Sequence, residues 1–186
     1  MRLTIYFFII FIFCAGNHFA QKPDCIEAEN LIKGSFENLY KISDKIYRSE
    51  QPKDTNWKVL ADEGMKTVIN LRHGNTNRKV PADLNIEMIY LPMKAYNIKY
   101  EKVVECLAVI HKTESPCLIH CLHGSDRTGC VLACSRMVFC GWTKEKAIEE
   151  FLDEKFGYHR FWFPGILKFL ENVDLEKMKA DVLNTN

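Results

Sequence analysis

One stretch of the chain carries residue types whose spacing suits covalent chemistry on a phosphate. Residues 120–129 read HCLHGSDRTG and directly follow the short apolar run CLI. A cysteine between a strand and a helix lies where backbone N–H groups and the helix dipole favour a negative charge, and the thiolate is the nucleophilic form of cysteine. The guanidinium of Arg127, six positions after Cys121, fits two oxygens of a phosphoryl group. The pattern predicts attack of the Cys121 thiolate on a phosphate ester.

The other residues of this stretch are assigned to binding and support. His120 is expected to orient the loop through backbone hydrogen bonds, and Thr128 to donate its hydroxyl to the thiolate. His123 is expected at the rim of the site, in contact with substrate or simply exposed to solvent. Successive backbone N–H groups form an anion cradle, which we assign to Leu122, His123, Gly124, Ser125, Asp126 and Arg127.

A second copy of the cysteine–arginine spacing serves as an internal control. Cys130 and Arg136 are also six positions apart, but they fall in an unbroken helical run that contains no glycine between them. A helix cannot form a cradle of converging N–H groups. The signal therefore comes from the preceding strand, the loop glycine and the Arg-Thr-Gly that follows, and not from the spacing alone.

The elements around the stretch alternate between strands and helices. Short β-branched and apolar runs predict strands, whereas apolar positions at helical spacing predict helices. Strands are expected at 45–48, 67–71, 87–91 and 117–120, and helices at 55–63, from Tyr100 towards Pro116, at 131–140, at 144–155 and from Phe163 onwards. Such alternation predicts an α/β fold with a central, mostly parallel sheet flanked by helices, and the Cys-x5-Arg loop between a strand and a helix.

Composition excludes several classes of protein. The 186 residues are 47% hydrophobic and carry a net charge of +1, so no basic field exists to hold nucleic acid. No apolar run approaches the roughly 20 residues of a membrane-spanning helix. We expect a monomer with no nucleic-acid partner and no stable membrane span, which acts on a phosphorylated protein or a small phosphoester.

The stretch at 120–129 resembles the signature of cysteine-dependent protein tyrosine and dual-specificity phosphatases. Segments 47–52 (YRSEQP) and 68–72 (VINLR) resemble N-terminal landmarks of that family, and 93–96, 141–142 and 156–159 resemble its bacterial dual-specificity-like branch. The resemblance covers roughly residues 40 to 172. It implies a phosphatase that works through a phosphocysteine intermediate and needs no metal or other cofactor.

The chain departs from that family at the general acid. The family carries an aspartate on a separate loop, which corresponds to about 93–97 here, but no Asp occurs between Asp83 and Asp126. We expect Asp126 to protonate the leaving group, an arrangement that also resembles the loop of myotubularin-type phosphoinositide phosphatases. The alternative is that Asp126 only braces the loop or pairs with a basic neighbour.

Four regions are expected along the chain. Residues 1–20 combine Arg2, an apolar run and a small final residue, which is typical of a secretory signal peptide. Residues 21–40 form an N-terminal extension, 41–175 the phosphatase domain and 176–186 a polar, loosely held tail. We expect export to the periplasm or the medium, with an uncleaved N-terminal membrane anchor as the alternative.

Cysteine usage argues against a disulfide framework. Removal of the signal segment leaves seven cysteines, an odd number, and several lie in apolar patterns. Cys117 is the nearest candidate for a protective disulfide with Cys121. A zinc cluster of Cys117, His120, Cys121 and His123 is not expected, because alternate strand residues point to opposite faces.

Three other functions remain open at this point. A non-catalytic phosphate-binding module would retain the cradle and lack turnover, and the missing upstream acid supports it. A phosphoinositide or inositol phosphate phosphatase would use the same chemistry on another substrate. A rhodanese-like sulfur transferase also places a cysteine between a strand and a helix, but the Arg-Thr-Gly argues against it.

Overall fold

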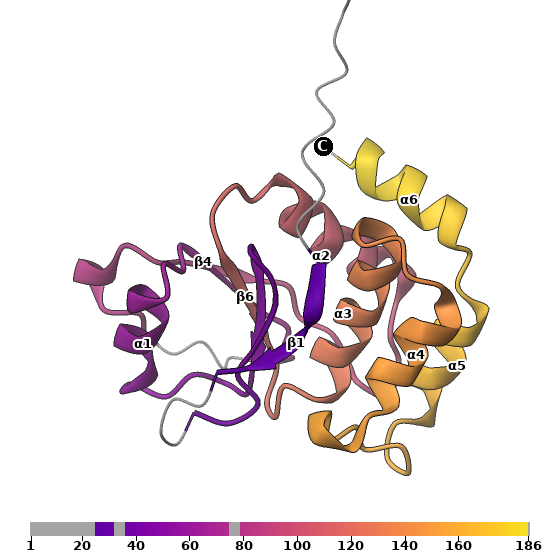
Figure 1. Ribbon diagram of the computed structural model, residues 1–186, viewed down its shortest axis with the longest axis horizontal. Coiled ribbons are helices and arrows are strands. Elements are labelled where there is room, and N and C mark those ends of the chain that lie inside the picture. Colours follow the sequence, from indigo (N-terminus) through magenta and orange to yellow (C-terminus); the bar gives the residue numbers. More distant parts are fainter. Residues whose placement is uncertain (1–24, 32–35, 75–78, 186) are drawn as a thin grey trace, which may run out of the picture.

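The computed structural model describes residues 25–31, 36–74 and 79–185, which form a six-stranded sheet between two layers of helices (Figure 1). The strand order is β1-β2-β3-β6-β4-β5. The strands are β1 (Cys25–Asn30), β2 (Tyr40–Ser43), β3 (Ile46–Ser49), β4 (Thr67–Asn70), β5 (Glu87–Tyr90) and β6 (Cys117–His120). The helices are α1 (Asn56–Asp62), α2 (Tyr100–Lys112), α3 (Asp126–Phe139), α4 (Lys144–Leu152), α5 (Pro164–Asn172) and α6 (Leu175–Asn184), with 3₁₀ turns η1 (Ala82–Leu84) and η2 (Glu154–Phe156).

The sheet is mostly parallel, as predicted. Strand β6 lies between β3 and β4 and runs parallel to both, and β4 runs parallel to β5. Strands β1 and β2 extend the β3 edge in antiparallel pairs. In a parallel sheet the carboxyl ends of neighbouring strands meet at one edge, where ligands bind. The residue after β6, Cys121, therefore lies at the middle of that edge.

Both faces of the sheet are covered, which explains why the central strands are apolar throughout. Every residue of β4 and of β6 is buried. Val68 and Leu118 pack with Trp57 of α1 in one core, while Ile69 and Ile119 pack in the larger core beneath α2, α3 and α5. This separation follows the alternation of side chains along a strand. Figure 1 shows α1 on one side of the sheet and α2 to α6 on the other.

Helix α3 begins five residues earlier than predicted. Its first residue is Asp126 and not Val131, and Ser125 is its N-cap residue. The predicted polar loop is thus shorter, and Asp126 and Arg127 lie in the first helical turn. Thr143 caps α4, since its Oγ1 accepts a hydrogen bond from the Lys146 amide at 3.2 Å.

The two segments expected to flank the phosphatase domain, 21–40 and 176–186, both contain regular structure. The region 21–40 was expected to be an extension, yet it contributes β1 and the buried side chains of Phe36 and Leu39. The expected polar tail is helix α6, whose Met178 and Val182 are buried in the core with α2. These two side chains are four positions apart and form a narrow apolar stripe on one face of the helix. Because charged residues surround them in the sequence, the composition of the segment gives no sign of this stripe.

The expected signal segment, residues 1–20, lies outside the described residues. Among the residues that the structure describes, no helix is long and apolar enough to cross a membrane.

The sequence argued against a disulfide framework, and the described residues contain one disulfide, which differs from the Cys117–Cys121 pair that the sequence offered. Cys25 of β1 is bonded to Cys140 at the end of α3, with Cα atoms 5.7 Å apart. Cys117 and Cys121 are not paired, and each is a buried free thiol. They stand four residues apart along an extended segment, about 13 Å at the rise of a strand, which is far too long for a disulfide.

Candidate active site

The cysteine of the loop lies at the bottom of a turn between β6 and α3. Cys121 is only 1% exposed, and Gly124, Ser125 and Asp126 are buried, whereas Leu122 and His123 are exposed at the rim. The Ser125 side chain makes no capping hydrogen bond to the helix. The amides of the first helical turn therefore lack a side-chain cap, and such amides are the usual partners of a bound anion.

Gly124 allows the loop to lie directly against strand β3. Its φ of +74° is unfavourable for other residues, and a Cβ atom there would lie 2.4 Å from the Ser49 carbonyl oxygen. The Gly124 carbonyl oxygen accepts a hydrogen bond from Arg48 Nη2 at 2.6 Å. The curvature of the loop thus depends on the absence of a side chain at position 124.

Arg48 places a buried positive charge behind the loop. Its guanidinium stacks 4.0 Å from the centre of the Phe156 ring. Burial lowers the pKa of Arg48 to about 10, while the negative charges of Glu150 and Cys121 act in the opposite direction. At this pKa the guanidinium stays protonated at neutral pH, so it places a positive charge behind the loop.

His120 contacts the loop backbone and remains neutral. Its Nδ1 lies 2.9 Å from the Cys121 carbonyl oxygen, so this nitrogen carries the proton and donates it. Burial lowers the pKa of His120 to about 4. The side chain therefore adds no charge at neutral pH, and its contact is the kind of backbone hydrogen bond that the sequence predicts.

Two further segments hold the outer side of the loop. Asn38 Nδ2 donates to the His123 carbonyl oxygen at 2.9 Å and to the Phe156 carbonyl oxygen at 3.3 Å. The Gln51 amide donates to the Leu122 carbonyl oxygen at 3.0 Å. These contacts direct loop carbonyl groups away from the interior, which leaves the loop amides to face an anion.

Arg127 and Thr128 differ in how they match their predicted roles. Arg127 is partly exposed, and within the described part of the chain its buried Nε has no hydrogen-bond partner, so it can bind a phosphate oxygen. Thr128 is fully buried, and its hydroxyl likewise has no partner among the described residues. The expected bond from Thr128 to Cys121 is therefore not formed in this structure.

Asp126 pairs with a histidine from a distant part of the chain. Its Oδ1 accepts a hydrogen bond from the His159 amide at 2.9 Å, and His159 Nδ1 lies 3.1 Å from Oδ1 and 3.0 Å from Oδ2. The Asp126 side chain is 4% exposed and that of His159 is 39% exposed. This is the pairing with a basic neighbour that the sequence left open as the alternative to the acid role.

The segment where an upstream acid would lie offers none. Residues 93–97 read MKAYN, with Met93 and Ala95 buried and the Tyr96 side chain 69% exposed. Asp126 is thus the carboxyl group that the phosphate-binding loop itself supplies.

Sequence reasoning missed the roles of three residues. Two of them, Arg48 and Asn38, lie 73 or more positions before Cys121 in the sequence, and His159 lies 38 positions after it. Only the fold brings these residues to the loop. The one available signal was an arginine inside the apolar strand run at 46–49, where a charge needs a partner.

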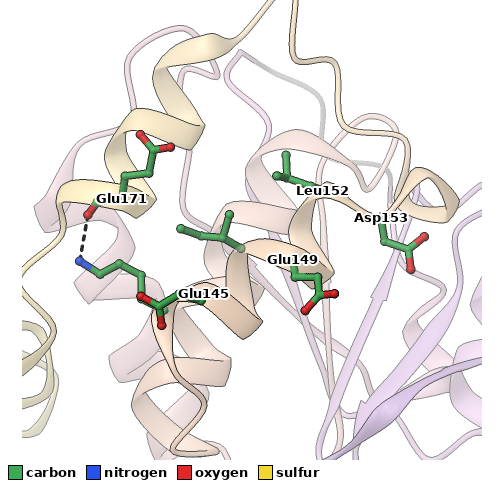
Figure 2. Close-up of a pocket in the computed structure, with 7 residues that line it drawn as sticks. Glu145, Glu149, Leu152, Asp153 and Glu171 are labelled. Atoms are coloured by element: carbon green, nitrogen blue, oxygen red, sulfur yellow. Dashed lines mark hydrogen bonds between the residues drawn. The ribbon is translucent and has the colours of Figure 1, made fainter.

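One cleft lies away from this loop. It has a volume of about 810 Å³ between α4 and α5, and Lys144 beside it donates to the Glu171 carbonyl oxygen at 2.9 Å (Figure 2). Carboxylates surround its aliphatic floor of Ile148 and Leu152. The carboxylates are Glu145, Glu149, Asp153 and Glu171. A phosphate dianion would be repelled by these carboxylates.

Comparison with known proteins agrees with this geometry. The chain is 32% identical over 122 residues to the dual specificity protein phosphatase TpbA of Pseudomonas aeruginosa, a match over 64% of this chain and 56% of that protein. It is 28% identical over 151 residues to the inositol diphosphatase DSP5 of Arabidopsis thaliana, covering 76% of this chain and 72% of that protein. The match thus spans little more than half the length of TpbA.

Solved structures show the same architecture. A crystal structure of a P. aeruginosa TpbA variant in complex with pTyr superposes with a TM-score of 0.74 at 25% identity, covering 90% of this chain and 99% of that one. The catalytic core of Siw14 from Saccharomyces cerevisiae shares the fold, with a TM-score of 0.65 at 24% identity over 81% of this chain and 93% of its own. The family model described as the tyrosine phosphatase family matches residues 35–185. The chain belongs to the tyrosine phosphatase family.

Proposed function

We propose that this protein hydrolyses phosphate monoesters, with phosphotyrosine-type aryl esters as its preferred substrates. The observation that carries the proposal is the placement of Cys121, buried at the carboxyl end of β6, facing the first turn of α3 and backed by the Arg48 guanidinium. A nucleophile, a set of amide donors and a positive charge are what phosphoryl transfer requires.

In the first step the Cys121 thiolate attacks phosphorus in line with the ester oxygen. An S–P bond forms, the P–O bond to the leaving group breaks, and the leaving oxygen keeps the electron pair and takes a proton. The equatorial oxygens are bound by the loop amides and by Arg127, whose Nε has no protein partner among the described residues.

In the second step water attacks the phosphocysteine. The S–P bond breaks, the thiolate is restored, and the proton of water passes to the base that donated in the first step. Inorganic phosphate then leaves. No cofactor is needed for either step, and the protein supplies binding, orientation and electrostatic stabilisation.

Asp126 is our candidate for this acid and base. It is the carboxyl group adjacent to Arg127, and His159 fixes both of its oxygens. To donate to the leaving oxygen, the Asp126 carboxyl group must be held in a fixed position at the loop. His159 holds it there and therefore acts as the positioning residue. The alternative, a purely structural Asp126–His159 pair, predicts no dependence on the leaving group.

The charges near the loop favour a simple aryl ester over a highly phosphorylated ring. Between Cys121 and Arg127 the loop contains a carboxylate and no lysine or second arginine. A cleft of about 360 Å³ beside His123 and His159 is lined by Glu37, Glu50 and Glu154 with one lysine, Lys155. Additional phosphate groups of an inositol diphosphate would approach these carboxylates and be repelled.

Export to an oxidising compartment is part of the proposal. Disulfides persist in the periplasm and outside the cell and are rare in the cytosol. The Cys25–Cys140 bond supports this localisation. We further propose that the protein acts as a monomer on phosphorylated proteins or small phosphoesters.

The test is a comparison of initial rates on a phosphotyrosine peptide, a phosphoserine peptide and an inositol diphosphate, with reductant present. We expect the phosphotyrosine peptide to react fastest and Cys121→Ser to be at least about a thousandfold slower. Faster cleavage of the inositol diphosphate would overturn the substrate assignment. Tight binding of all three by a folded, reduced protein that turns none over would favour the binding module.

The acid is tested by varying the leaving group. Asp126→Asn should slow hydrolysis of an alkyl or tyrosyl phosphate, whose leaving oxygen is basic and needs a proton, about 100-fold. It should have little effect on an aryl phosphate whose leaving oxygen is so weakly basic that it needs no proton. Equal losses on both substrates would assign Asp126 a structural role.

A further inference from the structure

We propose that His123, Asp126 and His159 form a binding site for a zinc ion at the edge of the phosphate-binding loop. Their candidate ligand atoms all lie within 4.8 Å of one another. Two imidazoles and one carboxylate are the donor types that Zn²⁺ takes, and three protein ligands leave its fourth position open.

The Asp126–His159 half of this site is already close to the geometry of a zinc site. Asp126 Oδ2 and His159 Nδ1 are 3.0 Å apart. Two ligand atoms each about 2 Å from a tetrahedral zinc ion lie about 3.3 Å from one another. The ion would take the place of the contact between these two atoms, with a shift of a few tenths of an ångström.

The remaining oxygen of the carboxylate is also held as a zinc ligand requires. Asp126 Oδ1 accepts a hydrogen bond from the His159 backbone amide at 2.9 Å. Such a second contact orients a metal-binding carboxylate and raises affinity. Asp126 is 2% exposed, so it differs from the exposed acidic groups that commonly lie near one another without a metal.

His123 can complete the site without a change in the backbone. Its ring centre is 5.3 Å from that of His159, and its side chain is exposed. Its carbonyl oxygen is fixed by Asn38, which holds the residue next to the pair.

The neighbouring cleft provides an approach for a cation. His123 and His159 line it together with Glu37, Glu50 and Glu154, against the single lysine Lys155. This excess of carboxylates attracts a dication to the edge of the loop. Nitrogen ligands favour Zn²⁺ over Mg²⁺, which prefers oxygen.

This set differs from the one that the sequence excluded. Of Cys117, His120, Cys121 and His123, only His123 takes part. Cys117 is buried near the start of β6, and His120 directs its Nδ1 at a carbonyl oxygen. Zinc binding would occupy Asp126 and so inhibit turnover; this consequence rests on the proposed function, whereas binding itself does not.

Binding is tested by calorimetric titration of Zn²⁺ into the Cys121→Ser protein, which removes the reactive thiolate as a competing ligand. We expect one ion per chain. His159→Gln or His123→Asn in the same background should weaken binding at least about tenfold. The control His111→Asn removes an exposed histidine on α2, outside the cluster, and should change nothing.

Three results would overturn the site. The first is that the Cys121→Ser substitution by itself abolishes zinc binding. The second is that zinc affinity is the same with and without each of the two histidine substitutions. The third is that Mg²⁺ binds as tightly as Zn²⁺. Circular dichroism confirms that each variant is folded. In the wild-type protein Zn²⁺ should inhibit phosphotyrosine hydrolysis, and a chelator should restore it. Binding without inhibition would keep the site and contradict the acid role of Asp126.

Discussion

At the scale of single residues, Gly124 connects the phosphate-binding loop to strand β3. A methyl group there meets the Ser49 carbonyl group, and the positive φ adds its own cost. We expect Gly124→Ala to lower both stability and kcat, with about 1–2 kcal/mol from the backbone conformation alone and more from the clash.

Gly141→Ala is the matched control for this substitution. Its φ of +69° is similar to the +74° of Gly124, but a Cβ at Gly141 has nothing within 4 Å. The control should therefore pay only the conformational cost and keep full kcat. Urea unfolding and initial rates measure both effects, and equal losses in the two variants would contradict the close approach to β3.

The residue pattern at 120–129 was enough to propose a nucleophile, an arginine and an anion cradle, because these lie in one continuous segment. It did not predict that Asp126 pairs with His159 or that Arg48 lies behind the loop. Both contacts join segments more than 30 positions apart, and a pattern within one segment contains no information about them.

At the scale of elements, the four parallel strands β3 to β6 were predicted, and the antiparallel strands β1 and β2 were not. β4 and β6 are short apolar runs, as strands covered on both faces are. β1 reads CIEAEN at the edge of the sheet, partly exposed along its length, so its sequence lacks a clear apolar face. Its position in the sheet is set by its pairing with β2 and by the disulfide bond to Cys140.

That disulfide should stabilise the molecule without affecting the site. It closes a loop with a sequence separation of 115, worth about 4–5 kcal/mol in the chain-entropy model. Cys140 lies at the C-terminal end of α3, and the phosphate-binding loop lies at its N-terminal end. The two ends of this helix are about 20 Å apart. We expect Cys140→Ser to lower Tm by at least about 5 °C with kcat unchanged.

Reductant provides the control for the disulfide. It should lower the Tm of the wild-type protein to that of a Cys25→Ser/Cys140→Ser variant and leave the variant unaffected. A wild-type Tm that is insensitive to complete reduction would show that the bond adds no stability.

Helix α6 should be part of the folded domain. Met178 is fully buried, so Met178→Ala is expected to cost about 2–5 kcal/mol of unfolding free energy. Leu183→Ala, on the same helix but 65% exposed, should cost less than about 0.5 kcal/mol. If both substitutions had equally small effects on the free energy of unfolding, residues 176–186 would be the loosely held tail that the sequence predicted.

At the scale of the whole molecule, one buried histidine gives stability a defined pH dependence. Burial lowers the pKa of His120 from its ordinary 6.5 to about 4 in the folded state. Between these values the unfolded chain binds a proton that the folded protein does not, so stability is full above pH 6.5 and falls as pH drops towards 4.

The size of this effect is on the order of 3 kcal/mol. His120→Asn keeps a donor for the Cys121 carbonyl oxygen and removes the titrating group. Urea unfolding at several pH values should therefore give a shallower loss of stability for the variant between pH 6.5 and 4. The same slope in both proteins would mean that His120 is not buried as a neutral group.

The fold places the Cys121 thiol between β6 and α3 at the centre of the sheet edge, and the proposed mechanism requires a covalent bond from phosphorus to that sulfur. The most direct measurement is mass spectrometry of the protein after rapid acid quenching during turnover of a phosphotyrosine peptide. We expect a phosphoryl group on the peptide that contains Cys121 and none in Cys121→Ser. Turnover with no phosphoryl group on Cys121, sustained at the wild-type rate by Cys121→Ser, would contradict the proposed mechanism.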